Sequence, residues 1–299
     1  MRELVAVKSP NQLPDLDSLK REALMFNRIA IPELLSTVGW MKAGYRPDNV
    51  QEWELADLDW LIENNILYDP EITLDDPRFQ ATDAYNDYLQ YQNALWQVTN
   101  SVLAGNLQPD ITAPPFSMAE LIVRLTSVQL RDLEDKDAYP LLDSNIFSTQ
   151  GEQASKSDVL QIVINALPVP DESTPWEQIL EFRSDSDSKD RFPSLRNWMN
   201  EVARAKLSPT EVEEKLEYLI FEFERHMKLH RMKNNKGTMA TLFITTAEFL
   251  EDLAKFKWSK IVKGLFTVRE RKIALLESEL KAKGNEIAYI VHASEHFSR

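Results

Sequence analysis

Apolar residues recur at intervals of three and four over most of the chain, a spacing typical of amphipathic helices. Two sites carry the same helix-start signal, because Thr174 and Ser208 each precede a proline and have a glutamate three residues on. A hydroxyl cap followed by a proline at the first helical position predicts a helix start. The helices expected cover residues 16–24, 50–64, 80–103 and 117–133, a helix from 175, a long helix from 209 to about 234, and residues 239–265 and 268–283, the last closed by Gly284.

Short runs rich in β-branched and aromatic residues predict strands. Residues 25–31 alternate well enough for a strand and stop at Pro32, which cannot donate to a ladder. The other strand candidates are residues 66–68, 138–142, 158–169 and 287–291. Residues 143–157 are poor in apolar positions and predict an exposed connection.

The fold class predicted is α+β, predominantly α-helical with a few short strands. Strand signals concentrate early in the chain, whereas the cleaner helix-start signals follow Pro170. A chain of 299 residues lies near the length at which one core divides into two. We predict an acidic mixed α/β unit over residues 1–169 and a helical unit over residues 170–299, in which the C-terminal half of the chain forms a helical bundle with a basic end.

Charge is distributed unevenly along the chain. Residues 1–224 hold 19 basic and 40 acidic residues, a net charge of −21, whereas residues 225–299 hold 15 and 8, a net charge of +7. This asymmetry indicates that the C-terminal region contacts either the acidic part of the chain or an anionic partner. We expect this region to bind an acidic protein surface or a second copy of the chain. Nucleic acid is a less favoured partner, because the acidic majority of the chain repels a polyanion.

The basic stretch is the strongest functional signal. Residues 225–272 hold 12 lysines and arginines against four acids, and between residues 255 and 266 the lysines interleave with apolar residues. This pattern predicts an amphipathic helix with a cationic side that binds a partner. A solvated helix face explains it equally well, so both interpretations stay open. The residues predicted to bind a partner are Lys255, Lys257, Lys260, Lys263, Arg269, Arg271 and Lys272.

All four histidines form pairs four residues apart, His226 with His230 and His292 with His296. Glu222 lies one turn before the first pair, so Glu222, His226 and His230 could bind a metal ion from one helix face. We favour a structural role, because neighbouring cations oppose a metal ion. These two histidines also continue a seam of apolar positions, Val212, Leu216, Leu219 and Phe223. We therefore expect no metal and no cofactor.

A metal-dependent hydrolase or nuclease is the alternative function, built on carboxylates together with His226 and His230. With 48 acids in the chain, acidic pairs arise by chance, and most lie at caps and turns, where aspartate is favoured for backbone reasons. The pairs are Asp15 and Asp17, Asp57 and Asp59, Asp75 and Asp76, and Asp185 and Asp187. Whether the protein is an enzyme stays open.

Composition excludes several other classes. The chain contains no cysteine, so disulfides, thiolate nucleophiles and cysteine-ligated metals are absent. Its seven glycines are not spaced as a phosphate-binding loop or a dinucleotide fingerprint. The N-terminus carries an acid at position 3 and no long apolar core, and the uncharged stretch 88–109 is interrupted by amides. We expect a cytoplasmic protein without membrane contact.

Four segments resemble a recurrent bacterial family of uncharacterised proteins: Glu-Phe-Arg-Ser-Asp at 181–185 with Leu-Arg-Asn-Trp at 195–198, His-Met-Lys-Leu-His at 226–230, and Glu-Ile-Ala-Tyr-Ile at 286–290. The resemblance covers mainly residues 170–297. It implies a bacterial origin and suggests defence against phage, and it transfers no activity and no catalytic residue. Together with the charge pattern, it leads us to predict a non-catalytic interaction or assembly component whose contact region begins at Pro209.

Overall fold

The computed structural model describes residues 2–13, 16–45, 52–71, 74–103, 118–141, 154–234 and 278–297. The chain divides into two units, unit 1 over Met1–Asp185 and unit 2 over Ser186–Phe297. The boundary lies beyond the position between residues 169 and 170 that the sequence suggested. Most of the connection predicted over residues 143–157 lies outside the described ranges.

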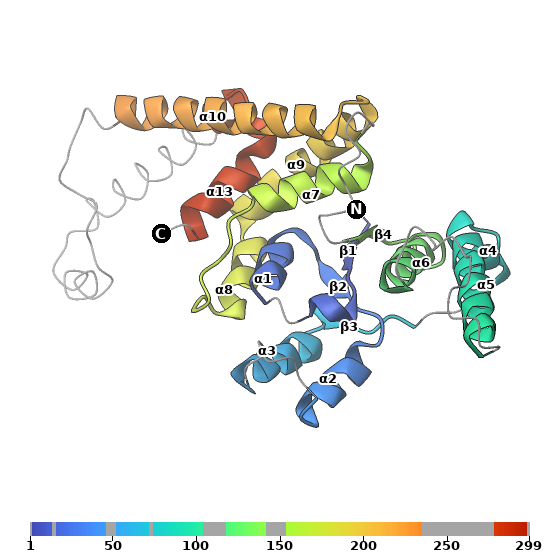
Figure 1. Cartoon of the computed structure of the whole chain (residues 1–299). Coiled ribbons are helices and arrows are strands. Elements are labelled where there is room, and N and C mark those ends of the chain that lie inside the picture. Colours follow the sequence, from blue (N-terminus) through green and yellow to red (C-terminus); the bar gives the residue numbers. More distant parts are fainter. Residues whose placement is uncertain are drawn as a thin grey trace. The chain divides into compact units, whose positions relative to one another are not determined.

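Unit 1 joins a small sheet to several helices (Figure 1). Its elements in chain order are β1 (Leu4–Val7), the 3-10 helix η1 (Pro10–Gln12), α1 (Leu16–Met25), β2 (Arg28–Ala30), α2 (Leu34–Lys42), α3 (Glu52–Glu63), β3 (Leu67–Tyr68), α4 (Pro77–Gln80), α5 (Asp83–Leu103), α6 (Met118–Asp132), β4 (Asp137–Pro140), α7 (Lys156–Ala166) and α8 (Trp176–Ser184).

The described elements of unit 2 are all helices or helical turns. The unit contains α9 (Ser186–Arg204), α10 (Pro209–Asn234), a helical turn over residues 278–281, the 3-10 helix η3 (Asn285–Ile287) and α13 (Ala288–Phe297). The predicted class, predominantly helical α+β with a few short strands, is confirmed.

The four strands form one parallel sheet in the order β3-β2-β1-β4. Ala6 in β1 is paired with Ile29 on one side and with Tyr139 on the other. From β1 the chain crosses to β2 in one direction, and it later returns to the opposite side of β1 to form β4. Because such crossovers are right-handed, α1 and α6 lie on opposite sides of the sheet (Figure 1).

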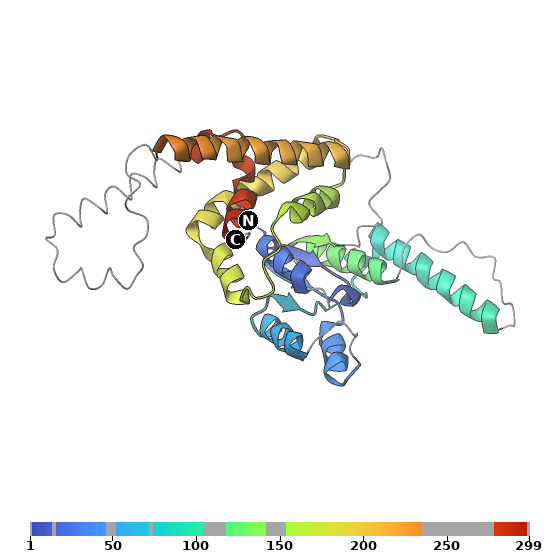
Figure 2. The same ribbon diagram turned by 60° about the vertical axis from the view of Figure 1, so that its left-hand side comes forward.

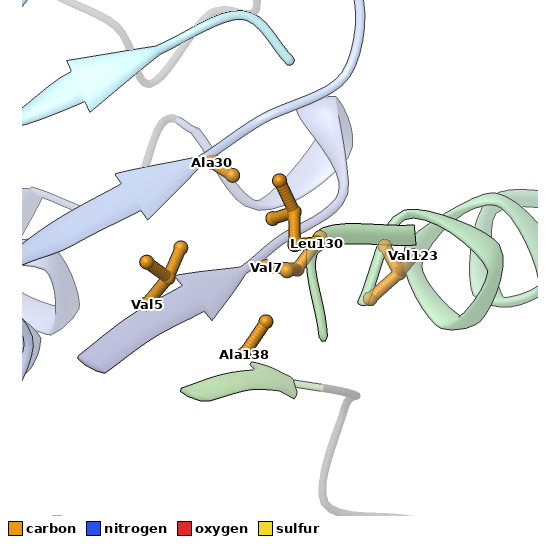
Figure 3. Close-up of a cluster of buried hydrophobic side chains, with 6 residues drawn as sticks. All are labelled: Val5, Val7, Ala30, Val123, Leu130 and Ala138. Atoms are coloured by element: carbon orange, nitrogen blue, oxygen red, sulfur yellow. The ribbon is translucent and has the colours of Figure 1, made fainter. Parts of the chain in front are cut away.

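One face of the sheet packs against α6. Val5 and Val7 of β1, with Ala30 and Ala138 from the neighbouring strands, form a buried cluster with Val123 and Leu130 of α6 (Figure 3). All four residues of β1 are buried, as expected for the central strand of a parallel sheet covered on both faces. β1 was absent from the predicted strands, because four apolar residues without alternation give no period to detect.

Two predicted strands are wrong, because both segments form helices. The stretch 158–169 falls largely in α7, where the Ser155 hydroxyl accepts from the Asp158 N–H at 3.2 Å and the Asp158 carboxylate accepts from the Ser155 N–H at 2.6 Å. This capping box starts a helix despite the β-branched side chains that follow. The stretch 287–291 lies in η3 and α13, where residues 287–291 are all buried.

Helix α8 belongs to unit 1 because its first residue is attached there. Trp176 is 5% exposed, and its indole Nε1 donates to the Asp57 carboxylate of α3 at 3.2 Å. The Lys20 ammonium of α1 donates to the carbonyls of Asp171 at 3.1 Å and Glu172 at 2.6 Å, in the segment that leads into α8. These contacts place the boundary between the units after α8.

In unit 2, a partly buried ion pair attaches residues 278–281 to α9. Two guanidinium nitrogens of Arg191 donate to the Glu279 carboxylate at 2.7 and 3.1 Å, and the Arg191 and Glu279 side chains are 11% and 15% exposed. Phe192 contacts Tyr289 of α13 edge-to-face at 5.1 Å between ring centroids. Helix α10 packs against η3 and α13, and the turned view in Figure 2 shows α13 (red) leading away from α10 (orange).

Candidate interaction surface on helix α10

Helix α10 starts as the sequence predicts. The backbone N–H and the hydroxyl of Ser208 donate to the Glu211 carboxylate at 2.7 and 2.9 Å, and the Glu211 N–H lies 3.4 Å from the Ser208 hydroxyl that accepts from it. These hydrogen bonds lower the pKa of the Glu211 carboxyl, the one from the backbone N–H first. With Pro209 at the first position, the start of the helix is fixed.

One side of α10 is buried in unit 2. The residues that are at most 6% exposed are Val212, Leu216, Leu219, Phe223 and Met227. The predicted seam is therefore confirmed as far as Phe223 and then continues at Met227 instead of His226, which is half-buried at its edge. Gly284, with φ of +87°, lies so close to α10 that an added Cβ would stand 2.5 Å from the Leu219 carbonyl oxygen.

The other side of α10 also carries large apolar side chains, but these face solvent. Tyr218, Phe221 and Leu229 are 49%, 60% and 50% exposed, and Leu280 on the helical turn after the undescribed segment is 73% exposed. Lys283 donates to the Tyr218 hydroxyl at 2.7 Å, and this hydrogen bond raises the pKa of Lys283. A helix that is apolar on two faces buries only one of them in its own unit.

Two of the three residues of the predicted metal set, Glu222 and His226, can be placed, and each has another partner. The Glu222 carboxylate accepts from Arg225 at 3.3 Å, and the His226 Nε2 atom is hydrogen-bonded to the Ser278 hydroxyl at 3.1 Å. The side chain of His230 lies outside the described part of α10. His292 and His296 share helix α13, which also contains most of residues 287–291, where a strand had been expected. Among the described residues no group of three histidines or acids could hold a metal ion.

The residues predicted to bind an acidic partner lie outside the described residues, so this hypothesis stays a prediction. They are Lys255, Lys257, Lys260, Lys263, Arg269, Arg271 and Lys272.

The acidic pairs of the hydrolase hypothesis serve local structure where they are described. Asp76 caps α4 and accepts from the Arg78 backbone N–H at 2.8 Å, and Asp59 pairs with Lys42 at 2.6 Å. Asp57 accepts from Trp176, and Asp185 ends α8. The carboxylates of Asp57, Asp59 and Asp76 are thus engaged with an indole, a lysine and a helix start, and Asp185 ends its helix through its backbone N–H.

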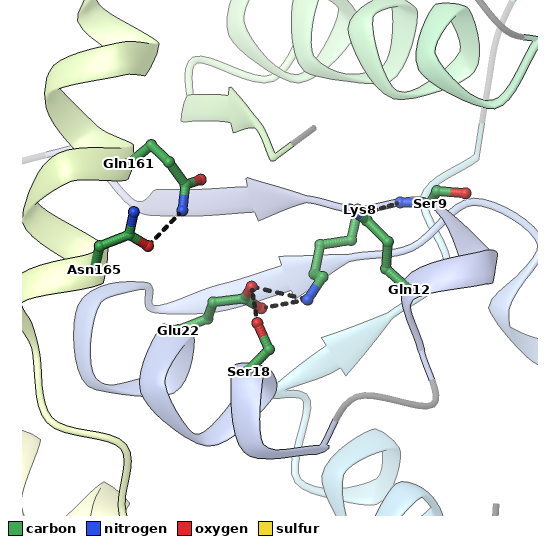
Figure 4. Close-up of polar contacts among 7 residues, drawn as sticks. All are labelled: Lys8, Ser9, Gln12, Ser18, Glu22, Gln161 and Asn165. Carbon is green, nitrogen blue, oxygen red and sulfur yellow. Dashed lines mark hydrogen bonds and ion pairs between the residues drawn. The ribbon is translucent and has the colours of Figure 1, made fainter. Parts of the chain in front are cut away.

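The carboxyl ends of the parallel strands form the edge where ligands bind in open sheets of this kind, at the point where the strand order reverses. In this chain the reversal lies between β1 and β4. Lys8 follows β1 directly, and its ammonium donates to both Glu22 carboxylate oxygens at 2.8 and 2.9 Å (Figure 4). The Ser18 hydroxyl donates to the same carboxylate at 3.1 Å. Lys8 is 2% exposed, so its ammonium serves the buried ion pair with Glu22 and not a ligand.

The start of α2 at this edge is likewise occupied. The Asp69 carboxylate, directly after β3, accepts from the backbone N–H groups of Glu33 at 3.0 Å and Leu35 at 3.2 Å. An internal carboxylate thus takes the place that an anionic ligand occupies at many helix N-termini. The described part of the edge offers structural rather than catalytic groups.

An open depression of about 570 Å³ in unit 1 is lined by Asp17 and residues 169–173. Lys20 lies beneath the same segment, and burial lowers the pKa of its ammonium although the carboxylates around it oppose this shift. Its donors are engaged with two carbonyl oxygens, and the Ser173 hydroxyl at the rim donates to the Asp171 carboxylate at 2.5 Å.

No family model, curated protein or solved structure matches the chain. The family resemblance and its implied defence role therefore stay predictions. Within the described ranges, no helix has the length and apolar character needed to cross a membrane.

Proposed function

We propose that this chain is a non-catalytic interaction or assembly component and that its contact region begins at Pro209. The observation that supports this most is the second apolar face of α10. Three large side chains on one helix, Tyr218, Phe221 and Leu229, are about half exposed or more, although the same helix already buries a complete seam. Clustered apolar side chains of this kind mark contact surfaces.

Charge supplies a second argument. Residues 209–224 of α10 hold six glutamates and one lysine, whereas residues 225–234 hold four basic residues and no acid. The acidic part of α10 is a surface of the kind that the basic residues 255–272 are proposed to bind, on this chain or on another protein. Complementary charge steers association and selects partners.

The experiment that tests this proposal measures binding of the full chain to immobilised poly-L-glutamate and to duplex DNA over a range of salt. Reversing Lys260 and Lys263 to glutamate should weaken retention on poly-L-glutamate. The matched control reverses two exposed lysines elsewhere, Lys189 and Lys206, with the same change in net charge. Equal effects of the two double variants would contradict the proposal, as would retention on DNA alone with a steep dependence on salt.

The metal-dependent hydrolase remains the alternative, since His230 and much of the basic region lie outside the described residues. It requires a stoichiometric metal ion that depends on Glu222 and His226, and elemental analysis of the purified chain tests this directly.

A further inference from the structure

The exposed face of α10 carries a self-complementary order of charges. At intervals of three, four, four and three residues it presents Glu214, Glu217, Phe221, Arg225 and Lys228, all of them exposed. At about 100° per residue, these five positions fall within about 80° of the helix circumference. The buried seam from Val212 to Met227 lies on the opposite side. We call these five residues the α10 stripe.

We propose that a second copy of this chain binds the α10 stripe, with the two α10 helices antiparallel and Phe221 on the two-fold axis. This inference rests on the proposed role of α10 as a contact region. In this register Glu217 of each copy faces Arg225 of the other, and Glu214 faces Lys228. The acidic half of the stripe thus meets the basic half of its copy, as a two-fold interface requires.

The spacing of the α10 stripe allows all the charge pairs between the two copies to form at once. Glu217 and Arg225 each lie about 6 Å along the axis from Phe221, and Glu214 and Lys228 about 10.5 Å, at 1.5 Å per residue. Phe221, which is 60% exposed, meets its own copy at the centre. A parallel pair would instead place glutamate against glutamate and arginine against arginine, so the charges select the antiparallel arrangement.

Within one chain the stripe is weakly engaged. Arg225 contacts Glu222 at 3.3 Å, with the two side chains 64% and 23% exposed. Exposed ion pairs of this kind contribute little to stability, so Arg225 can exchange Glu222 for Glu217 of a second copy at small cost. Tyr218 and Leu229 flank the stripe and extend its apolar contact.

The absence of cysteine from the chain permits a geometric test with the full-length protein. In the proposed register, Phe221→Cys places two thiols at the axis, within reach of a disulfide under mild oxidation. Glu214→Cys is the matched control, because its two copies lie about 21 Å apart along the axis. Cross-linking of the first variant alone supports the proposal. Cross-linking of Glu214→Cys equal to that of Phe221→Cys overturns it.

A charge exchange measured by sedimentation is the second test. Glu217→Arg alone and Arg225→Glu alone each create like-charge contacts on both sides of the axis and should raise the dissociation constant about tenfold or more. The variant with both changes restores opposite charges and should return the dissociation constant to near that of the original chain. Circular dichroism establishes that each variant is folded. Self-association is overturned if the chain stays monomeric at every concentration, or if the double variant has a dissociation constant as high as those of the single variants. The proposed function is judged separately by the binding of poly-L-glutamate.

Discussion

Gly284→Ala is expected to destabilise unit 2 strongly, because this glycine combines a left-handed backbone with a close approach to α10. An alanine at φ of +87° costs about 1 kcal/mol. Its Cβ would stand 2.5 Å from the Leu219 carbonyl oxygen and 3.2 Å from the Phe223 Cβ atom, so residues 284–287 must move away from α10. Overpacking of this kind costs about 1 to 3 kcal/mol. The expected total is about 2 to 4 kcal/mol of unfolding free energy.

Two other glycines separate the contributions. Gly44 also has a positive φ, +96°, but a Cβ added there would have nothing within 4 Å, so Gly44→Ala should cost about 1 kcal/mol. Gly39 lies inside α2 with the same free space, and Gly39→Ala should stabilise by about 0.5 to 1 kcal/mol.

The assay is urea unfolding monitored by hydrogen exchange and mass spectrometry. Peptides of α2, α10 and α13 are measured separately, because the two units need not unfold together. If Gly284→Ala loses no more stability than Gly44→Ala, the close packing of residue 284 against α10 is refuted.

Three further predictions concern the fold and the site. Glu22→Leu leaves the buried Lys8 ammonium unpaired and should cost about 3 to 5 kcal/mol in urea unfolding, whereas adding Lys8→Met should recover most of it; no recovery would contradict a buried pair. Ser208 lowers the pKa of Glu211, so this stabilisation is present above pH 4.5 and is lost as the pH falls through the folded value. The protection factors of amides at the start of α10, which correct the exchange rate for its intrinsic dependence on pH, should therefore fall below pH 4.5 in the original chain and much less in Glu211→Gln; identical profiles would refute this. His226→Gln should leave the metal content measured by elemental analysis unchanged, and loss of a stoichiometric metal would favour the hydrolase.

Local signals in the sequence predicted the helices best. The starts of α7 and α10 depend on hydrogen bonds within four residues, such as those between Ser208 and Glu211, and α10 was predicted from them. The strand predicted over 158–169 failed because the prediction rested on β-branched residues and did not recognise the capping box at Ser155. The strand predicted over 287–291 failed because burial on all sides removes the period that distinguishes a helix from a strand.

The candidate surface needed the structure. The sequence placed Phe223, which is 3% exposed, in the apolar seam of α10, but only the structure shows that Phe221, outside that seam, is 60% exposed. The α10 stripe is present in the sequence as a spacing of charges around Phe221, but its meaning depends on which side of the helix faces solvent. The central position of β1 in the sheet depends on contacts between residues far apart in the sequence, which no local sequence pattern reveals.

The most direct test of the central claim is native mass spectrometry of the purified full chain, combined with elemental analysis of the same sample. The proposed self-association through the α10 stripe predicts a species of two chains that dissociates in Glu217→Arg, and the proposed non-catalytic role predicts that the chain carries no stoichiometric metal ion. A monomer that holds one equivalent of metal, and loses it when Glu222 and His226 are replaced by glutamine, would contradict that role and establish the metal site instead.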